Sequence, residues 1–230
     1  MGTVADMRVS RTLVVLAAAL ALTCAGCDRL TDGTAVANGA PPGSAITEDG
    51  TGILAGYPDA AVQIEIFTEP QCPGCARLQQ DYGKEIADYI GRGELAVTYR
   101  PLIFIDTSTD YSARVANAMF LAAGDGTTGT QFQAFVQELW SHQQREGSPG
   151  PTDDEMADMA RKSGVDDARV AAIAGADHRV DTDQMAEQNA DMLSDIAGAV
   201  STPTVYDQTD EELVELDDNW LSELMSRSAN

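Results

Sequence analysis

Basic residues are scarce in this sequence, and their scarcity excludes several functions. The chain has 14 lysine and arginine residues against 37 aspartate and glutamate residues, a formal net charge of −23. Such a surface repels the phosphates of nucleic acids and anionic lipid head groups. No basic patch offsets this repulsion, so we expect no nucleic acid partner.

Long hydrophobic stretches are also scarce, because the sequence has only one, near its start. The run "TLVVLAAALALT" (residues 12–23) follows Arg8 and Arg11 and is too short to span a bilayer comfortably. A positive segment followed by a short apolar run is typical of a signal peptide. We therefore predict a signal peptide over residues 1–26 and a domain outside the cytoplasm, where disulfides persist.

The residues that follow the apolar run predict a lipid anchor. Ala25 and Gly26 precede Cys27 and resemble the end of a bacterial lipobox, although Cys24 stands where a lipobox prefers leucine. We predict that Cys27 is lipidated and holds the protein at the outer face of the cytoplasmic membrane; plain secretion is the alternative. Residues 27–58 are rich in small and polar residues and predict a flexible tether, which leaves 59–230 as the folded domain.

The folded domain begins with a pattern typical of a strand, a helix and a second strand. Residues 61–68 are rich in β-branched side chains, residues 72–90 repeat apolar residues at helical spacing, and residues 94–106 read as a strand. This order predicts a βαβ unit. Helical patterns then fill residues 110–198, before a strand at 202–207, a weak strand at 212–216 and a last amphipathic helix.

Cysteine is scarce too, yet Cys72 and Cys75 lie three residues apart in "CPGC". A zinc or copper site needs further ligands, and the candidates are acidic groups and the lone histidines His142 and His178, which we expect to be exposed. A structural disulfide across so short a loop would remove little chain entropy. A redox dithiol fits best, because a helix N-terminus favours a thiolate at Cys72 and leaves Cys75 to resolve a mixed disulfide.

Two motifs resemble a known family. "FTEPQCPGC" after a strand, a long helical insertion and then "VSTPTV" (200–205) are similar to the DsbA-like branch of the thioredoxin superfamily. The resemblance implies an α/β, thioredoxin-like fold with a mixed central sheet and an inserted helical subdomain at about 110–198. It also implies that Pro203 is a cis-proline preceded by Thr202, and that these two residues, with Pro73 and Gly74, contact the substrate.

The sequence departs from that family at two positions. Many relatives carry a buried carboxylate six residues before the first cysteine, where this chain has Ile66, and we expect the adjacent Glu65 to point to the opposite face of the strand. Strongly oxidising relatives often carry histidine where Gly74 stands, so we expect a less acidic Cys72 here. Glu69 lies close to the motif and is predicted to be a solvated loop carboxylate.

These observations predict an exported, membrane-tethered protein disulfide oxidoreductase that forms, or less readily reduces, disulfides in secreted proteins. Cys72 and Cys75 are its predicted catalytic residues, and no cofactor or metal is expected. Its predicted partners are exported proteins with thiols or disulfides and a membrane redox protein that resets the dithiol. The alternative is a tethered metal-binding protein that uses the two thiolates.

Overall fold

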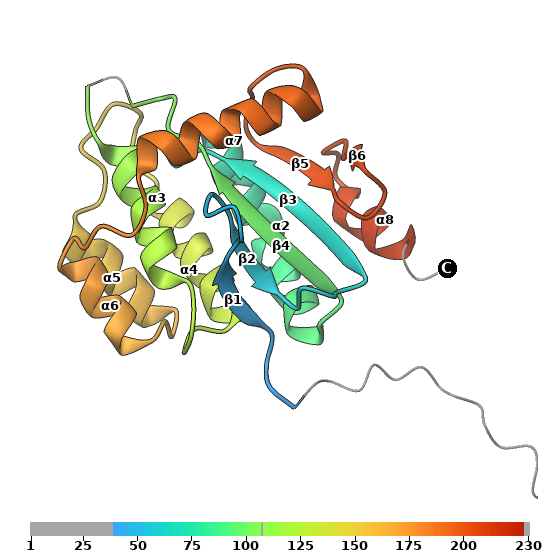
Figure 1. Cartoon of the computed structure of the whole chain (residues 1–230), viewed down its shortest axis with the longest axis horizontal. Coiled ribbons are helices and arrows are strands. Elements are labelled where there is room, and N and C mark those ends of the chain that lie inside the picture. The colour runs from blue at the N-terminus through green and yellow to red at the C-terminus, as the bar shows by residue number, and fades with distance from the viewer. Residues whose placement is uncertain (1–38, 107, 228–230) are drawn as a thin grey trace, which may run out of the picture. The chain divides into compact units, whose positions relative to one another are not determined.

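Six strands form one mixed sheet at the centre of the domain, and the computed structural model describes residues 39–106 and 108–227 (Figure 1). The central pair, β3 and β4, is parallel, and every other neighbouring pair is antiparallel. The order across the sheet is β1 (Gly43–Ile46), β2 (Ile53–Gly56), β4 (Leu95–Pro101), β3 (Val62–Thr68), β5 (Thr204–Asp207) and β6 (Glu212–Leu213).

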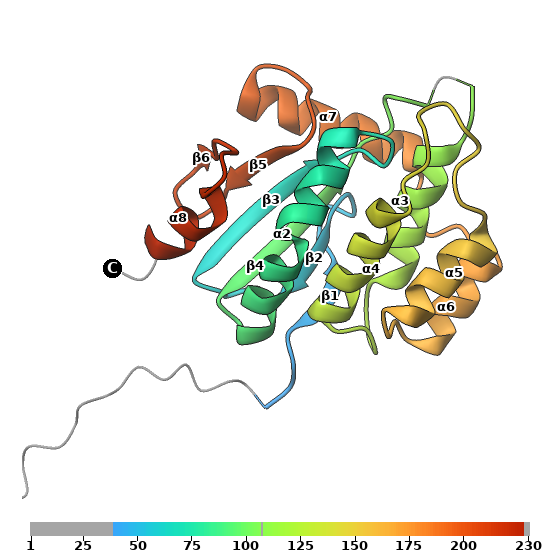
Figure 2. The ribbon, with the colours of Figure 1, turned by 180° about the vertical axis from the view of Figure 1, so that it is seen from behind.

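Helices cover both faces of this sheet. The described helices are α2 (Pro73–Arg92), α3 (Tyr111–Ala122), α4 (Gly129–Ser141), α5 (Asp153–Lys162), α6 (Asp167–Ala174), α7 (Thr182–Ala197) and α8 (Trp220–Arg227). In Figure 2, α2 and α4 lie in front of the sheet, and in Figure 1 α7 crosses its other face. Helices α3 to α7 all lie between β4 and β5 in the chain, so the predicted fold class and helical insertion are confirmed.

The side-chain pattern of β3 explains why this strand separates two apolar clusters. Successive side chains of a strand point to opposite faces. Ile64 and Ile66 belong to the large core shared with α2 to α6, whereas Phe67 belongs to a smaller cluster with Leu102 and Leu193 of α7. The large core forms because α4 and its neighbours turn their apolar stripes inward.

Local signals fix the ends of the helices that matter most for the site. The predicted capping box of α5 is present, with Thr152 and Glu155 bonded to each other's backbone N–H groups. Helix α2 begins with Pro73, whose missing N–H is not needed in the first turn. It ends at Gly93, whose φ of 73° is a left-handed conformation that favours glycine. Among the described residues, no helix is apolar and long enough to cross a membrane.

The predicted tether is too long, because part of it is folded. Strands β1 and β2 form a hairpin within residues 27–58 and extend the sheet beside β4. Ile53 and Ala55 are fully buried there, and Asp49 in the turn pairs with Arg100 of β4 at 2.7 Å between Oδ2 and Nη1. Strands of four residues carry too little periodicity to be recognised in a glycine-rich stretch. Cys27 and the predicted signal peptide lie outside the described residues.

Candidate active site

The two cysteines lie where β3 ends and α2 begins. Cys72 is the N-cap of α2 and is partly exposed, whereas Cys75, one turn further, has 1% of its surface exposed. Both are free thiols in this structure. The sequence therefore places a reachable sulfur at the helix N-terminus and a shielded sulfur behind it, as predicted.

The environment of Cys72 favours its thiolate. The pKa of Cys72 is lowered to about 5, chiefly because the Cys75 thiol donates a hydrogen bond to its sulfur. The side chain of Thr202 and the backbone N–H groups of Gly74 and Cys75 lower this pKa further, while burial opposes them. A value of about 5 lies between the ~3.5 of the most oxidising relatives and the ~7 of thioredoxin. Gly74 is thus no obstacle to an acidic cysteine.

Cys75 has the opposite electrostatics. Burial raises the pKa of the Cys75 thiol far above its usual range, and its hydrogen bond to Cys72 and the charge of that thiolate raise it further. The backbone N–H of Glu69 points at Cys75, with 3.4 Å between N and Sγ. At neutral pH the reduced pair therefore consists of one thiolate and one thiol.

A second loop, with a cis peptide bond between Thr202 and Pro203, faces the cysteines. The predicted cis geometry is confirmed. The Sγ atom of Cys72 lies 3.3 Å from the carbonyl oxygen of Thr202, an interaction in which a protonated thiol donates. A Cβ atom built on Gly74 would lie 2.9 Å from Cδ of Pro203, so only glycine fits here without displacing a neighbour.

A groove with a volume of about 370 Å³ leads away from this contact between the two loops. It begins at Gly74 and Pro203 and has apolar and aromatic walls with acidic residues beside them. Its other lining residues are Arg77, Leu78, Asp81, Tyr82, Leu216, Asp217, Asp218 and Trp220. Desolvation raises the pKa of Tyr82, and the negative charges of Asp218, Asp81 and Asp217 raise it further.

Glu69 is not the solvated carboxylate predicted from the sequence. It is fully buried, and its carboxylate accepts hydrogen bonds from the backbone N–H of Gln71, at 2.6 Å, and from the hydroxyl of Ser112. Burial raises the pKa of Glu69 to about 7, and the nearby charges of Asp106 and Cys72 act in the same direction. Sequence reasoning missed this burial, because Ser112 lies 43 residues away.

Glu65 and Ile66 lie as predicted. Ile66 is buried in the large core, so no carboxylate stands six residues before Cys72. Glu65 points to the other face of the sheet, where its Oε1 lies 2.8 Å from Nη2 of Arg100. Both side chains of this pair are almost fully buried, at 4% and 6% exposure, so the pair ties β3 to β4 away from the cysteines.

The helical subdomain supplies contacts to the active-site loop that sequence reasoning missed. The side-chain amide of Gln143 donates to the carbonyl oxygens of Pro70 and Cys72, at 2.8 and 2.9 Å. The side chain of Gln71 accepts from the backbone N–H of Gly147 and donates to Asp106. Lone glutamines at this sequence distance carry no recognisable signal.

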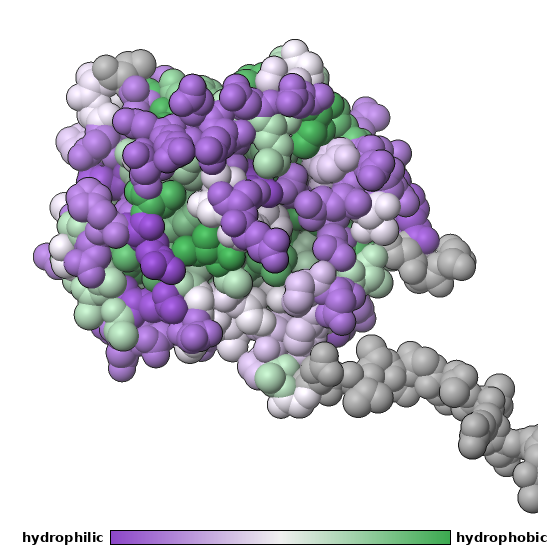
Figure 3. All heavy atoms as spheres, in the orientation of Figure 1, coloured by the Kyte–Doolittle hydropathy of each residue, from purple (hydrophilic) through white to green (hydrophobic). Residues whose placement is uncertain are grey.

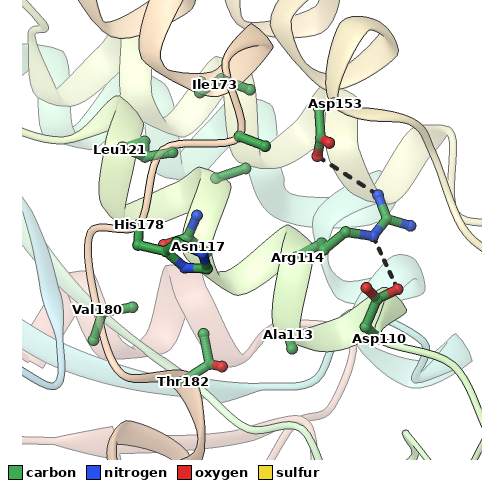
Figure 4. Close-up of a pocket in the computed structure, with 12 residues that line it drawn as sticks. Asp110, Ala113, Arg114, Asn117, Leu121, Asp153, Ile173, His178, Val180 and Thr182 are labelled. Carbon is green, nitrogen blue, oxygen red and sulfur yellow. Dashed lines mark hydrogen bonds and ion pairs between the residues drawn. The ribbon is translucent and has the colours of Figure 1, made fainter.

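The histidines do not join the cysteines. His142 and His178 are both exposed, as predicted, and His178 lines a separate pocket of about 310 Å³ in the helical subdomain (Figure 4). Arg114 bridges Asp110 and Asp153 at the edge of that pocket (Figure 4). Neither Cys72 nor Cys75 lines it.

The metal-binding alternative is not supported. In the part of the chain that the structure describes, the one group of three side chains spaced for a metal ion is Asp207, Asp210 and Glu212. Neither cysteine belongs to it, and Arg227 already pairs with Glu212. A site built on Cys72 and Cys75 would therefore lack the further ligands that zinc requires.

Comparisons with known proteins agree with this geometry. A family model described as thioredoxin matches residues 48–220. The serine/threonine-protein kinase PknE of Mycobacterium tuberculosis is 30% identical over 163 residues, which are 68% of this chain and 28% of that protein. The chain thus spans 28% of the length of the curated relatives that it matches.

Solved structures share the fold. The thiol-disulfide oxidoreductase MdbA from Corynebacterium matruchotii superposes with a TM-score of 0.65 and 23% identity, over 80% of this chain and 92% of that one. Reduced DsbA from Mycobacterium tuberculosis superposes with a TM-score of 0.60 and 17% identity, over 79% of this chain and 93% of that one. Oxidised BdbD from Bacillus subtilis superposes with a TM-score of 0.57 and 18% identity, over 82% of this chain and 97% of that one.

Proposed function

The chain belongs to the thioredoxin family, and on that premise we propose that it is an exported thiol–disulfide oxidoreductase that exchanges disulfides with other proteins through Cys72 and Cys75. One observation carries the proposal. The partly exposed sulfur of the pair is held as a thiolate, with a pKa of about 5, while the buried sulfur stays protonated. Disulfide exchange needs this division, because both the attacking group and the leaving group are thiolates.

In the oxidising direction, a thiolate of the substrate attacks Cys72 in the Cys72–Cys75 disulfide. The bond between the two sulfurs breaks, Cys75 leaves with the electron pair, and a mixed disulfide forms at Cys72. A second substrate thiolate then attacks the substrate sulfur of that mixed disulfide. The substrate leaves oxidised, Cys72 leaves as a thiolate, and the protein keeps two reduced cysteines.

We place the protein on the oxidising side. A thiolate that is stabilised only in the reduced protein favours the reduced form, so the disulfide becomes a stronger oxidant. Each unit by which the pKa of Cys72 falls below its ordinary value contributes to this preference. A membrane redox protein would then return the dithiol to the disulfide after each turnover.

The groove beside Gly74 and Pro203 is where we place the substrate chain. An extended segment can pair with the backbone of Thr202 before the cis-proline, as an added strand does. Pro73 and Gly74 would border it on the other side, and the apolar walls of the groove would hold the side chains that flank the reacting cysteine. The acidic rim favours substrates with basic residues near that cysteine.

We further propose that a lipid at Cys27 holds the domain at the outer face of the cytoplasmic membrane. The support is the sequence of Ala25, Gly26 and Cys27 after the apolar run. The hairpin of β1 and β2 begins at Gly43, so the tether proposed over residues 27–58 is shorter than predicted.

Trapping of mixed disulfides tests the redox proposal. Cys75→Ser should accumulate mixed disulfides with exported proteins, because the resolving thiol is missing, and Cys72→Ser, the matched control, should accumulate none. Equal trapping by both variants, or by neither, contradicts the assignment. The reduction potential of the purified pair, measured against glutathione, then decides the direction: a value near ~−120 mV supports an oxidase and one near ~−270 mV a reductase.

A further inference from the structure

Glu69 carries a buried carboxyl group that interacts with the charge of Cys72 and for which the exchange steps above have no use. It has none of its surface exposed, and its own backbone N–H contacts the sulfur of Cys75 at 3.4 Å. A buried carboxylate is costly unless it is paired or becomes neutral. None of the described residues that hydrogen bond to the Glu69 carboxylate carries a positive charge.

The groups around Glu69 come from three elements, and they favour its protonated form. Cys72 and Cys75 face it from α2, Asp106 from the loop after β4, and Tyr111 from the start of α3. Each of these is neutral or negative at neutral pH. A Cys72 thiolate therefore favours a proton on Glu69, and by linkage a charged Glu69 disfavours the thiolate.

A chain of hydrogen bonds connects this buried carboxyl group with a more accessible one. Ser112 bonds to Glu69 through its hydroxyl, and Gln71 donates its side-chain amide both to Ser112, at 3.0 Å, and to Asp106, at 2.7 Å. Asp106 is partly exposed and also accepts from the backbone N–H groups that begin α3. Asp106 thus lies between Glu69 and solvent.

We propose that Glu69 is the proton-exchanging residue of the dithiol, in a position that replaces the carboxylate absent at Ile66. The inference rests on the proposed redox function. When the substrate thiolate attacks Cys72, the sulfur–sulfur bond breaks and Cys75 leaves as a thiolate. Glu69 gives its proton to that sulfur, so that Cys75 becomes a thiol and Glu69 a carboxylate, and solvent returns a proton to Glu69 past Asp106. The only sulfur–sulfur bonds that change are the Cys72–Cys75 bond, which breaks, and the mixed disulfide, which forms, so the step needs no other oxidant or reductant.

The protonation of Cys75 has a clear direction. The pKa of Cys75 lies far above its usual range and that of Glu69 at about 7, so transfer from the carboxyl group to the sulfur is strongly downhill. A group with a pKa close to the working pH is suited to give and regain a proton in each turnover. In the reverse reaction the same carboxylate accepts the proton of Cys75 before it attacks.

Glu69→Gln tests the proposal, because an amide keeps the shape and hydrogen-bonding capacity of the side chain but does not titrate. The oxidised protein is mixed with dithiothreitol from about pH 5 to about pH 9, and the rate of the first exchange step is followed by stopped flow. The wild type should show an inflection near pH 7 that the variant lacks. At neutral pH the variant should react on the order of tenfold more slowly, since water replaces a positioned acid.

The matched control is Glu65→Gln. It removes a similarly buried carboxylate from β3, the strand that leads to Glu69, but one that points to the opposite face and pairs with Arg100. This variant should keep the wild-type pH profile. If Glu69→Gln also keeps it, or if both variants lose it, the assignment of the proton to Glu69 is wrong.

A second readout separates this inference from the redox proposal, because it needs no exchange. The infrared band of the Glu69 carboxyl group is titrated in the reduced wild type and in reduced Cys72→Ser. The pKa of Glu69 should be lower in Cys72→Ser than in the wild type, since the repulsion by the Cys72 thiolate is gone; an unchanged pKa overturns the coupling. If the variant does not fold, the infrared band of a protonated carboxyl group in the wild type near pH 6 decides, and its absence overturns the proposal.

Discussion

The pH dependence of folding stability offers a test of the Cys72 thiolate that needs no substrate. The perturbation is a rise in pH from about 7 to about 8.5, applied to the protein reduced with an excess of dithiol. The pKa of Cys72 is lowered from 9.0 to about 5 in the folded protein. In this window the unfolded chain still holds the proton of Cys72, whereas the folded chain has lost it.

The sign and size of the effect follow from proton linkage. Because the folded pKa is depressed, the stabilisation is complete above the unfolded pKa and is lost as the pH falls toward 5. One such group changes the free energy of unfolding by ~1.4 kcal/mol per pH unit, or about 2 kcal/mol over the window. Cys72 is partly exposed, so solvent screening reduces the expected gain to about 1–2 kcal/mol.

The choice of window keeps Glu69 out of the measurement. Its folded pKa is raised from 4.5 to about 7, so it contributes stability below about 4.5 that is lost as the pH rises to 7. Between about pH 5 and 7 the two groups therefore oppose each other. Glu69 is half titrated at pH 7 and contributes little above about pH 8, so the Cys72 term dominates the window, and the burial of Cys75 begins to oppose it only near pH 9.

Urea unfolding of the reduced protein at several pH values in the window measures the effect, with Cys72→Ser as the control. The wild type should gain about 1–2 kcal/mol in the free energy of unfolding, and the variant should stay nearly flat. Parallel curves for the two proteins would refute the argument, because a sulfur that is not held as a thiolate contributes no slope. The oxidised protein, which has no thiolate, should resemble the variant.

Three further predictions follow from the packing and the sequence. Gly74→Ala should slow dithiol oxidation on the order of tenfold, because the new Cβ would lie 2.9 Å from Cδ of Pro203. The control Gly91→Ala, whose Cβ would have its nearest contact at 3.3 Å, should leave turnover unchanged. Equal rates for the two variants in a turnover assay would contradict this prediction. Arg100→Met should lower the free energy of unfolding, measured in urea, by about 3–5 kcal/mol, because it leaves the buried carboxylate of Glu65 unpaired. The control Arg92→Met breaks an exposed pair and should lower it by at most ~1 kcal/mol. Similar losses in the two variants would argue against the burial of the pair between Arg100 and Glu65. Cys27→Ser should move the protein from the membrane to the soluble fraction of fractionated cells, and a variant that stays with membranes would rule out the lipid anchor.

The parts of the fold that follow from short-range patterns could be predicted from the sequence. The βαβ unit around Cys72, the capping box at Thr152 and the helical insertion each depend on residues close together in the chain, and all are present. The resemblance to a family added the cis peptide before Pro203, which periodicity alone does not reveal. The surface of the domain also reflects its composition, since the face in Figure 3 is covered mainly by hydrophilic residues.

The features that were missed depend on partners far away in the chain. Glu69 is a polar residue in a loop, and local reasoning places such a residue in solvent; only the arrival of Ser112 on α3 makes its burial possible. The hairpin of β1 and β2 is similar, because Asp49 and its turn are held by Arg100, 51 residues later. Buried polar groups of this kind are specified by the assembled fold.

The hydrogen bonds from Gln143 to the active-site loop have a consequence for the order in which the parts of the site are synthesised. The amide that holds the carbonyl oxygens of Pro70 and Cys72 is synthesised 71 residues after the cysteine it positions. A chain that emerges N-terminus first therefore carries two cysteines for some time before their loop can be fixed. Until α4 has folded, the pair lacks one of the contacts that hold its loop in place, so its properties should approach those of ordinary cysteines. Reactivity toward other proteins would then appear late, as an outcome of completing the insertion, and a nascent chain would be protected from exchanging disulfides prematurely.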